Sequence, residues 1–188
     1  MANSGKERWN ALKWILRYLK GTSDCGLLFE KNLNSDLLVG YVDSDYAGDL
    51  DKRRSTTEFI FTLGEGPISW KATLQNIVAL SIIEVEYITA VEAAKKVAWL
   101  KDLVKELSIS QKIISLHCDS QSAIYLVKDP IFHARTKYID IRYHKLRELV
   151  SSDDIKLVKV STQDNFTDML TKFLPVAKFL YYLDLANI

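Results

Sequence analysis

The sequence predicts an α/β fold in which helices cover a mixed β-sheet. Three strand-like runs, at 37–44, 56–63 and 67–72, are separated only by short turns, which favours antiparallel neighbours. After them, strands alternate with helical segments, a pattern typical of parallel strands joined by right-handed crossovers. The length of 188 residues, with 48% apolar and 26% charged residues, suits one globular domain with a short appendage.

Hydrophobic spacing and turn residues predict the other elements. Residues 5–20 have helical spacing and Gly21 ends this helix, whereas 25–30 are short and extended. The polar connector 31–36 places a boundary near its end. Behind the three strands we expect a helix at about 81–107, a strand at 112–118, helices at 121–128 and 136–151, a strand at 155–160, a helix at about 165–173 and an aromatic tail after Pro175.

Composition excludes several classes of protein. No apolar run approaches the roughly 20 residues that cross a bilayer, and the N-terminus lacks a secretory signal, so we expect an intracellular protein, cytoplasmic or nuclear, with no membrane partner. Cys25 and Cys118 match neither a disulfide framework nor a metal-binding spacing, so both are expected as reduced thiols and zinc is not expected.

The net charge of +1 leaves binding to local patches. One basic patch lies between 133 and 147, where Asp140 is the only acidic residue. The alternative to a binding role is a solvated helix face. The basic residues of this patch are Arg135, Lys137, Arg142, Lys145 and Arg147.

Two carboxylates stand where apolar residues are expected. Asp43 ends an apolar run, although Asp is depleted within strands. The alternative is that the strand ends at Val42 and Asp43 opens a turn. Glu86 lies on the predicted core stripe of its helix, with Ile82 and Ile83 among the other members, and a buried carboxylate needs a cation or donors. The alternative for Glu86 is an ion pair with Lys71.

Two more carboxylates stand near the ends of elements. Asp119 follows the strand 112–118, at the end where α/β sheets build their sites, although Asp119 or Ser120 could equally cap the next helix. Asp168 lies early in the last helix, where an acidic residue is also favoured by the helix dipole. Together with Asp43 and Glu86 they predict an acidic cluster that holds two hard cations, Mg²⁺ or Mn²⁺.

Several blocks in order resemble the ribonuclease H domain of copia-type LTR retrotransposon polyproteins. The resemblance extends over nearly the whole chain, and the end of the first helix resembles the segment that links reverse transcriptase to that domain. The blocks are 41–49 (YVDSDYAGD), 54–57 (RSTT), 67–71 (PISWK), 78–81 (VALS), 84–87 (EVEY), 118–124 (CDSQSAI), 133–137 (HARTK), 139–144 (IDIRYH) and 168–172 (DMLTK).

The resemblance implies a ribonuclease H-like five-stranded mixed sheet, with the first three strands antiparallel, flanked by helices. It implies endonucleolytic cleavage of the RNA strand of an RNA–DNA hybrid, and a reverse transcriptase as partner within the parent polyprotein. The family's metal-binding residues fall on Asp43, Glu86, Asp119 and Asp168. The implied division of the chain is a reverse transcriptase remnant at 1–35, the ribonuclease H-like domain at 36–174 and a C-terminal tail at 175–188.

Some residues depart from the family pattern without removing a metal ligand. Ile82 and Ile83 replace a polar helix entry, which could shift the helix start, and Glu58 stands where the family generally has Gly. Tyr138 and Thr167 replace the usual His and Ala. Many cellular ribonucleases H carry a His just before the last Asp, and 161–165 has none. Water activation is therefore expected to rest on the metals, with His133 and His144 as remote alternatives.

We expect Asp43 to bridge both ions, Glu86 and Asp119 to complete the nucleophile side, and Asp168 to hold the second ion. The alternative function is a catalytically silent nucleic-acid-binding or scaffolding module. An integrase-like nuclease is a weaker reading, because the chain lacks its three-carboxylate arrangement and zinc-binding region. Residues expected to contact the hybrid, or else to serve as turn and cap residues, are Ser120, Gln121, Asn76 and Gln75, and the basic residues Arg135, Lys137, Arg142 and Lys145 are expected to bind its phosphates.

Overall fold

A computed structural model describes residues 5–27, 29, 37–49, 51–128 and 140–188, of which 140–145 are described by their backbone alone. Within these residues, no helix combines the length and the apolar character that a bilayer crossing demands.

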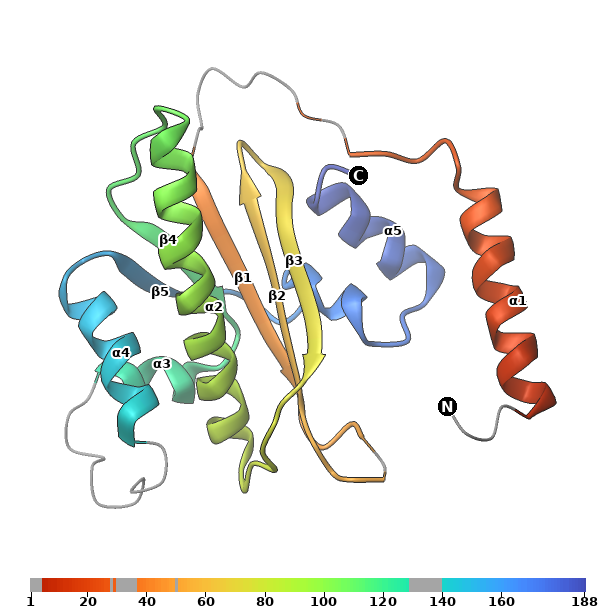
Figure 1. Ribbon diagram of the computed structural model, residues 1–188, viewed down its shortest axis with the longest axis horizontal. Coiled ribbons are helices and arrows are strands. Elements are labelled where there is room, and N and C mark those ends of the chain that lie inside the picture. The colour runs from red at the N-terminus through yellow and green to blue at the C-terminus, as the bar shows by residue number, and fades with distance from the viewer. Residues whose placement is uncertain (1–4, 28, 30–36, 50, 129–139) are drawn as a thin grey trace.

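The centre of the fold is a five-stranded sheet with the order β3-β2-β1-β4-β5 (Figure 1). Its first three strands, in chain order, are antiparallel neighbours, and β4 and β5 continue the sheet parallel to β1. The predicted mixed sheet is confirmed. The strands are β1 (Leu38–Asp45), β2 (Thr56–Leu63), β3 (Gly66–Leu74), β4 (Ile114–Cys118) and β5 (Ile155–Lys159).

Helices cover the two faces of this sheet unequally. On one face lie α2 (Ile82–Glu106), α3 (Gln121–Lys128) and α4 (Asp140–Ser151). On the other face lie the 3-10 helix η2 (Phe166–Leu170) and α5 (Val176–Leu185) (Figure 1).

Strand β1 separates two hydrophobic cores because its side chains alternate between the faces. Leu38 and Val42 point into the larger core with α2. Tyr41 packs on the other face against Phe166, with the two rings 4.4 Å apart. By the same alternation, Asp43 faces the side of η2 and α5.

Helix α2 begins where the sequence predicts, but the side chains of its first turn do not lie in the core. Ser81 is the N-cap, and its Oγ accepts a hydrogen bond from the Glu84 N–H at 3.2 Å, so the apolar entry shifts nothing. The placement of Ile82 and Ile83 on the core stripe was wrong, because they are 60% and 42% exposed. This first turn reaches past the ends of β1 and β3 (Figure 1), where no sheet remains to cover it.

The C-terminal elements also differ from the prediction. The expected helix at 165–173 is only the short η2, and the residues after Pro175 form α5. Tyr182 of α5 is fully buried and belongs to the second core, together with Ile60 and Phe166. The helix α1 (Lys6–Gly21) buries none of its side chains.

Gly40 of β1 is paired with Phe61 of β2 and with Leu116 of β4, and a methyl group at this position would be crowded. A Cβ would stand 2.5 Å from Phe61 Cε1 and 2.7 Å from Leu116 Cδ1. We expect Gly40→Ala to lower the free energy of unfolding by about 1–3 kcal/mol, as overpacked cores do. Urea denaturation measures this. Gly26→Ala, where nothing lies within 4 Å, is the control, and equal stability of both variants would contradict the crowding.

Candidate acidic site

The four predicted carboxylates come from four elements around the carboxyl ends of β1 and β4. Asp43 lies inside β1, which continues to Asp45, so the alternative that the strand ends at Val42 is wrong. Asp119 follows β4 directly, and β4 runs parallel to β1, so both residues reach the same edge of the sheet. Glu86 comes from the second turn of α2 and Asp168 from η2.

Asp43 and Asp168 are joined by a lysine that the sequence analysis did not single out. Lys172 Nζ lies 2.6 Å from Asp43 Oδ2 and 2.6 Å from Asp168 Oδ1. Both carboxylates are buried, at 2% and 4% exposure, so the ammonium supplies the positive charge that their burial requires. Lys178 Nζ lies farther out, 3.8 Å from Asp168 Oδ2.

The position of Asp168 depends on a long-range anchor. Asn165, at the start of η2, donates from Nδ2 to the backbone oxygen of Val42 at 2.9 Å. Thr167 donates in turn to Asn165 Oδ1 at 2.7 Å, which orients the amide. Both side chains are fully buried, so η2 is held against the same strand that carries Asp43.

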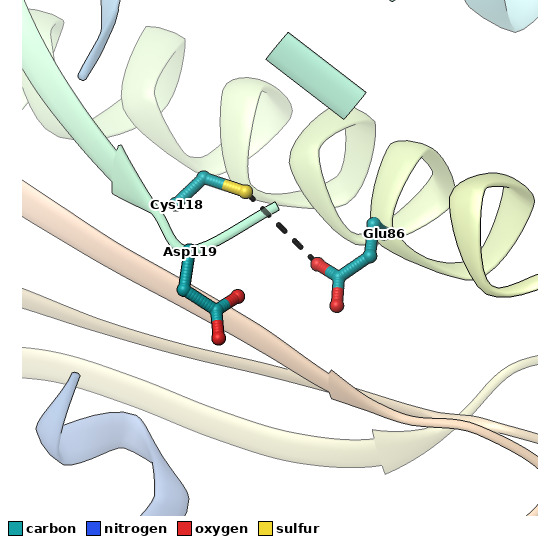
Figure 2. A group of neighbouring side chains, drawn as sticks. All are labelled: Glu86, Cys118 and Asp119. Atoms are coloured by element: carbon teal, nitrogen blue, oxygen red, sulfur yellow. Dashed lines mark hydrogen bonds between the residues drawn. The ribbon is translucent and has the colours of Figure 1, made fainter. Parts of the chain in front are cut away.

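Glu86, Cys118 and Asp119 form the second half of the site (Figure 2). One ligand atom from each lies within 4.8 Å of the others, and Cys118 Sγ is 4.0 Å from Glu86 Oε2. Burial raises the pKa of Cys118 to about 12, which favours a thiol in the metal-free site, and ions that prefer oxygen ligands would be held by the two carboxylates. Asp119 accepts a hydrogen bond from Thr162 Oγ1 at 3.0 Å.

Electrostatic interactions couple the Asp43–Asp168 pair to the Glu86–Asp119 pair. Burial raises the pKa of Glu86 to about 7, and the charge of Asp119 adds to this. Burial also raises the pKa of Asp43, which Asp168 and Glu86 raise further against the opposing effect of Lys172. Burial acts on Asp168 as well, but its hydrogen bonds with Asp43 and Lys172 outweigh it and hold its pKa below the usual range.

A fifth carboxylate, Glu58, was missed as a site residue. It is the cross-strand partner of Asp43 in the β1–β2 ladder, and such partners point to the same face. Its side chain is fully buried. Oε1 accepts a hydrogen bond from the Thr171 hydroxyl, whereas Oε2 has no partner. Burial raises the pKa of Glu58 to about 7.

The sequence contains a local signal for Lys172 but not for Glu58. Lys172 stands four residues after Asp168, a spacing that brings side chains together on a helical turn. Glu58 becomes visible only once the register of β1 and β2 is known, because the register makes it the neighbour of Asp43.

The residues predicted to contact a hybrid divide into three groups. Ser120 caps α3, because its Oγ accepts a hydrogen bond from the Ala123 N–H at 3.3 Å. Gln121, the first residue of α3, and Asn76, which precedes α2, are both exposed. Gln75 was wrong as a contact, because it is buried and donates to Thr57 Oγ1 at 3.1 Å. Arg135 and Lys137 lie outside the described residues, and Arg142 and Lys145 lie on α4, where only the backbone is described.

Several solved structures with a similar architecture are ribonucleases H. The N-terminal RNase H domain of a Mycobacterium tuberculosis protein matches 73% of this chain and 91% of its own, with a TM-score of 0.54 and 12% identity. RNase H1 from the archaeon Halobacterium salinarum matches 68% of this chain and 88% of its own, with a TM-score of 0.51 and 17% identity. The chain therefore has the ribonuclease H fold, as its sequence led us to expect.

Sequence relatives narrow this class. A retrovirus-related Pol polyprotein from transposon TNT 1-94 of Nicotiana tabacum is 50% identical over 95% of this chain, and one from transposon RE2 of Arabidopsis thaliana is 41% identical over 88%. The chain is thus homologous to one segment of the copia-type retrotransposon Pol polyproteins. It spans only 13% and 11% of these two relatives. No family model matches it.

The buried carboxylate of Glu86 should make stability depend on pH. In the folded protein Glu86 keeps its proton up to about pH 7, whereas in the unfolded chain it loses it near its ordinary value of 4.5. Between these values the folded state binds more protons, so the free energy of unfolding falls as the pH rises. In a metal chelator, the free energy of unfolding of Glu86→Gln should therefore fall less with rising pH than that of the wild type, by up to about 3 kcal/mol.

Denaturation midpoints between pH 4.5 and 8 measure this effect. Glu92→Gln is the matched control, because Glu92 lies on the same helix and is only paired with Lys95 at its surface. If the stability of Glu86→Gln falls with pH as steeply as that of the control, the raised pKa of Glu86 is contradicted.

Proposed function

We propose that this chain is a metal-dependent endonuclease that hydrolyses the RNA strand of RNA–DNA hybrids. The observation that carries the proposal is the acidic site, in which Asp43, Glu86, Asp119 and Asp168 approach one another from four elements of a ribonuclease H fold. One of the similar solved structures is an RNase H1 in complex with an RNA/DNA hybrid, and this supports the substrate class.

The chemistry of the side chains fits divalent ions with oxygen ligands. Four carboxylates are present, burial raises the pKa of the neighbouring Cys118 thiol, and Lys172 already places a cation in contact with two of the acids. Two Mg²⁺ or Mn²⁺ ions held by these four residues would supply activation of water and stabilisation of the leaving oxygen. The protein's part is to fix the carboxylates, chiefly through β1 and the anchor of η2 on Val42.

The substrate would bind mainly through its backbone. Basic residues between 133 and 147 are proposed to contact phosphates of the DNA strand, while the RNA strand is recognised by its 2′-hydroxyls along the minor groove. Such contacts carry little sequence information, so weak sequence preference is expected.

The relatives are much longer than this chain, so a reverse transcriptase portion of a polyprotein is proposed as a partner. A similar solved structure, a foamy viral protease–reverse transcriptase in complex with double-stranded DNA, supports this kind of partner. The intracellular location and the division into 1–35, 36–174 and 175–188 stay predictions from the sequence.

A catalytically silent module of the same fold is the second candidate. The feature that favours it is Lys172, which already neutralises Asp43 and Asp168. A silent module would bind a hybrid but leave its RNA strand intact.

Asp43→Asn and Glu86→Gln separate these functions. Each replaces a carboxylate by an amide of the same shape, so the fold and hybrid binding should be kept. Cleavage of a labelled RNA strand in Mg²⁺ or Mn²⁺ should fall by at least about 100-fold, since even residues behind metal ligands cost 10–100-fold. Wild-type protein that binds the hybrid without cleaving it would exclude the nuclease.

The basic patch should govern the salt dependence of binding. Joint replacement of Arg135, Lys137, Arg142 and Lys145 by Gln should flatten the plot of log affinity against log salt by about 3 units, because each phosphate contact contributes about 0.7–0.9. Fluorescence anisotropy on a labelled hybrid measures this. The control is replacement of four exposed lysines elsewhere by Gln, which removes the same charge. An equal change of the salt slope in the control would contradict a specific role of the basic patch in binding. The control set is Lys20, Lys105, Lys112 and Lys156.

A further inference from the structure

Lys172 occupies a position suited to a metal ion. Its Nζ contacts Asp43 Oδ2 and Asp168 Oδ1, both at 2.6 Å, and these side chains are 3% and 6% exposed. The lysine side chain itself is 36% exposed, so it enters the site from solvent. The ammonium is therefore held by the acids at one end of a flexible stem, and it can leave without movement of the sheet.

Glu58 offers a second place for this ammonium. Its carboxylate is buried beside Asp43, in the cross-strand position where Cβ atoms are about 5 Å apart. Oε1 is taken by Thr171, the residue before Lys172, while Oε2 has no partner. A buried acceptor without a donor is costly, so Oε2 favours the arrival of a cationic donor. Lys172 is already close enough to act on Glu58 electrostatically.

We propose that Lys172 is a resident cation that a divalent ion must displace from between Asp43 and Asp168, and that Glu58 receives the displaced ammonium. This inference rests on the proposed function, because it takes Asp43 and Asp168 as metal ligands. It adds that the chain's own lysine competes with the metal, and it gives Glu58 a role as a positioning residue for that lysine.

Charge balance favours both positions of the lysine. Without metal, removal of the ammonium would leave two buried carboxylates facing each other, which is unfavourable. With a divalent ion between them, the two acids are neutralised and the ammonium is repelled. At Glu58 it again meets one negative charge, so neither state leaves a buried cation without an acid.

Mn²⁺ binding without nucleic acid tests the competition. Calorimetric titration of Lys172→Met should give a dissociation constant at least about tenfold lower than that of the wild type, which corresponds to about 1.4 kcal/mol. Lys178→Met is the matched control, since it removes an equal charge 3.8 Å from Asp168 and outside the Asp43–Asp168 gap. Equal affinity of Lys172→Met and the wild type would overturn the proposal.

Thermal unfolding provides a second readout. In chelator, Lys172→Met should unfold at a lower temperature than the wild type, and Mn²⁺ should remove the difference. If the variant is unfolded in chelator, folding on addition of Mn²⁺ supports the proposal, whereas a variant that stays unfolded in Mn²⁺ contradicts it.

Glu58→Gln tests the receiving position. It keeps an oxygen for Thr171 but loses the charge, so Mn²⁺ binding should weaken several-fold in the wild-type background. In the Lys172→Met background the same substitution should have no effect, because there is no ammonium to receive. Weakening in both backgrounds would instead identify Glu58 as a direct ligand and overturn this role.

The outcomes also separate this inference from the proposed nuclease. If the wild type cleaves the RNA strand while Lys172→Met binds Mn²⁺ no more tightly, only the lysine competition fails. If the Mn²⁺ results are as expected but no hybrid is cleaved, only the nuclease fails.

Discussion

The constraint that dominates this protein is the burial of several negative charges at one end of its central strand. Asp43 and Glu58 are neighbours across β1 and β2, and Asp168 and Glu86 approach Asp43 from opposite faces of the sheet. Repulsion and loss of hydration both oppose such an arrangement. The fold tolerates it through Lys172, through the raised pKa of Glu86, which favours the neutral form of that side chain, and through the hydrogen bonds that Thr171 and Thr162 donate.

The two cores explain why the charges gather at this place. Apolar side chains of β1 fill the large core beneath α2 and a smaller one beneath η2 and α5. Asp43 and Ser44 follow Val42, the last residue of β1 that belongs to either core. A site between two layers can take ligands from both, which a site on one face of a sheet cannot.

Several parts of this arrangement could be predicted from the sequence. Asp43 was visible as a charge at the end of an apolar run, and Glu86 as a charge on a helical core stripe. These signals survive because alternation and helical spacing are local properties. The mixed sheet followed from the order of the elements and from their short connections.

The missed features depend on distant parts of the chain. Glu58 becomes a neighbour of Asp43 only through the register of β1 and β2, and Lys172 reaches Asp43 only because the bend after η2 lies against β1. The exposure of Ile82 and Ile83 depends on where the sheet ends beneath α2, which helical spacing does not contain. The helix α5 is short, and its buried Tyr182 faces a core formed with Ile60 from far upstream.

The bond from Asn165 to Val42 spans 123 residues and has a consequence for synthesis of the chain. A ribosome releases the residues of β1 long before those of η2, and the β1–β4 pair can form first. Until η2 emerges, Asp43 is without both Asp168 and Lys172, and half of the acidic site does not exist. In any longer chain that contains this segment, the acidic site is therefore completed only after strands β1 and β4 have been synthesised.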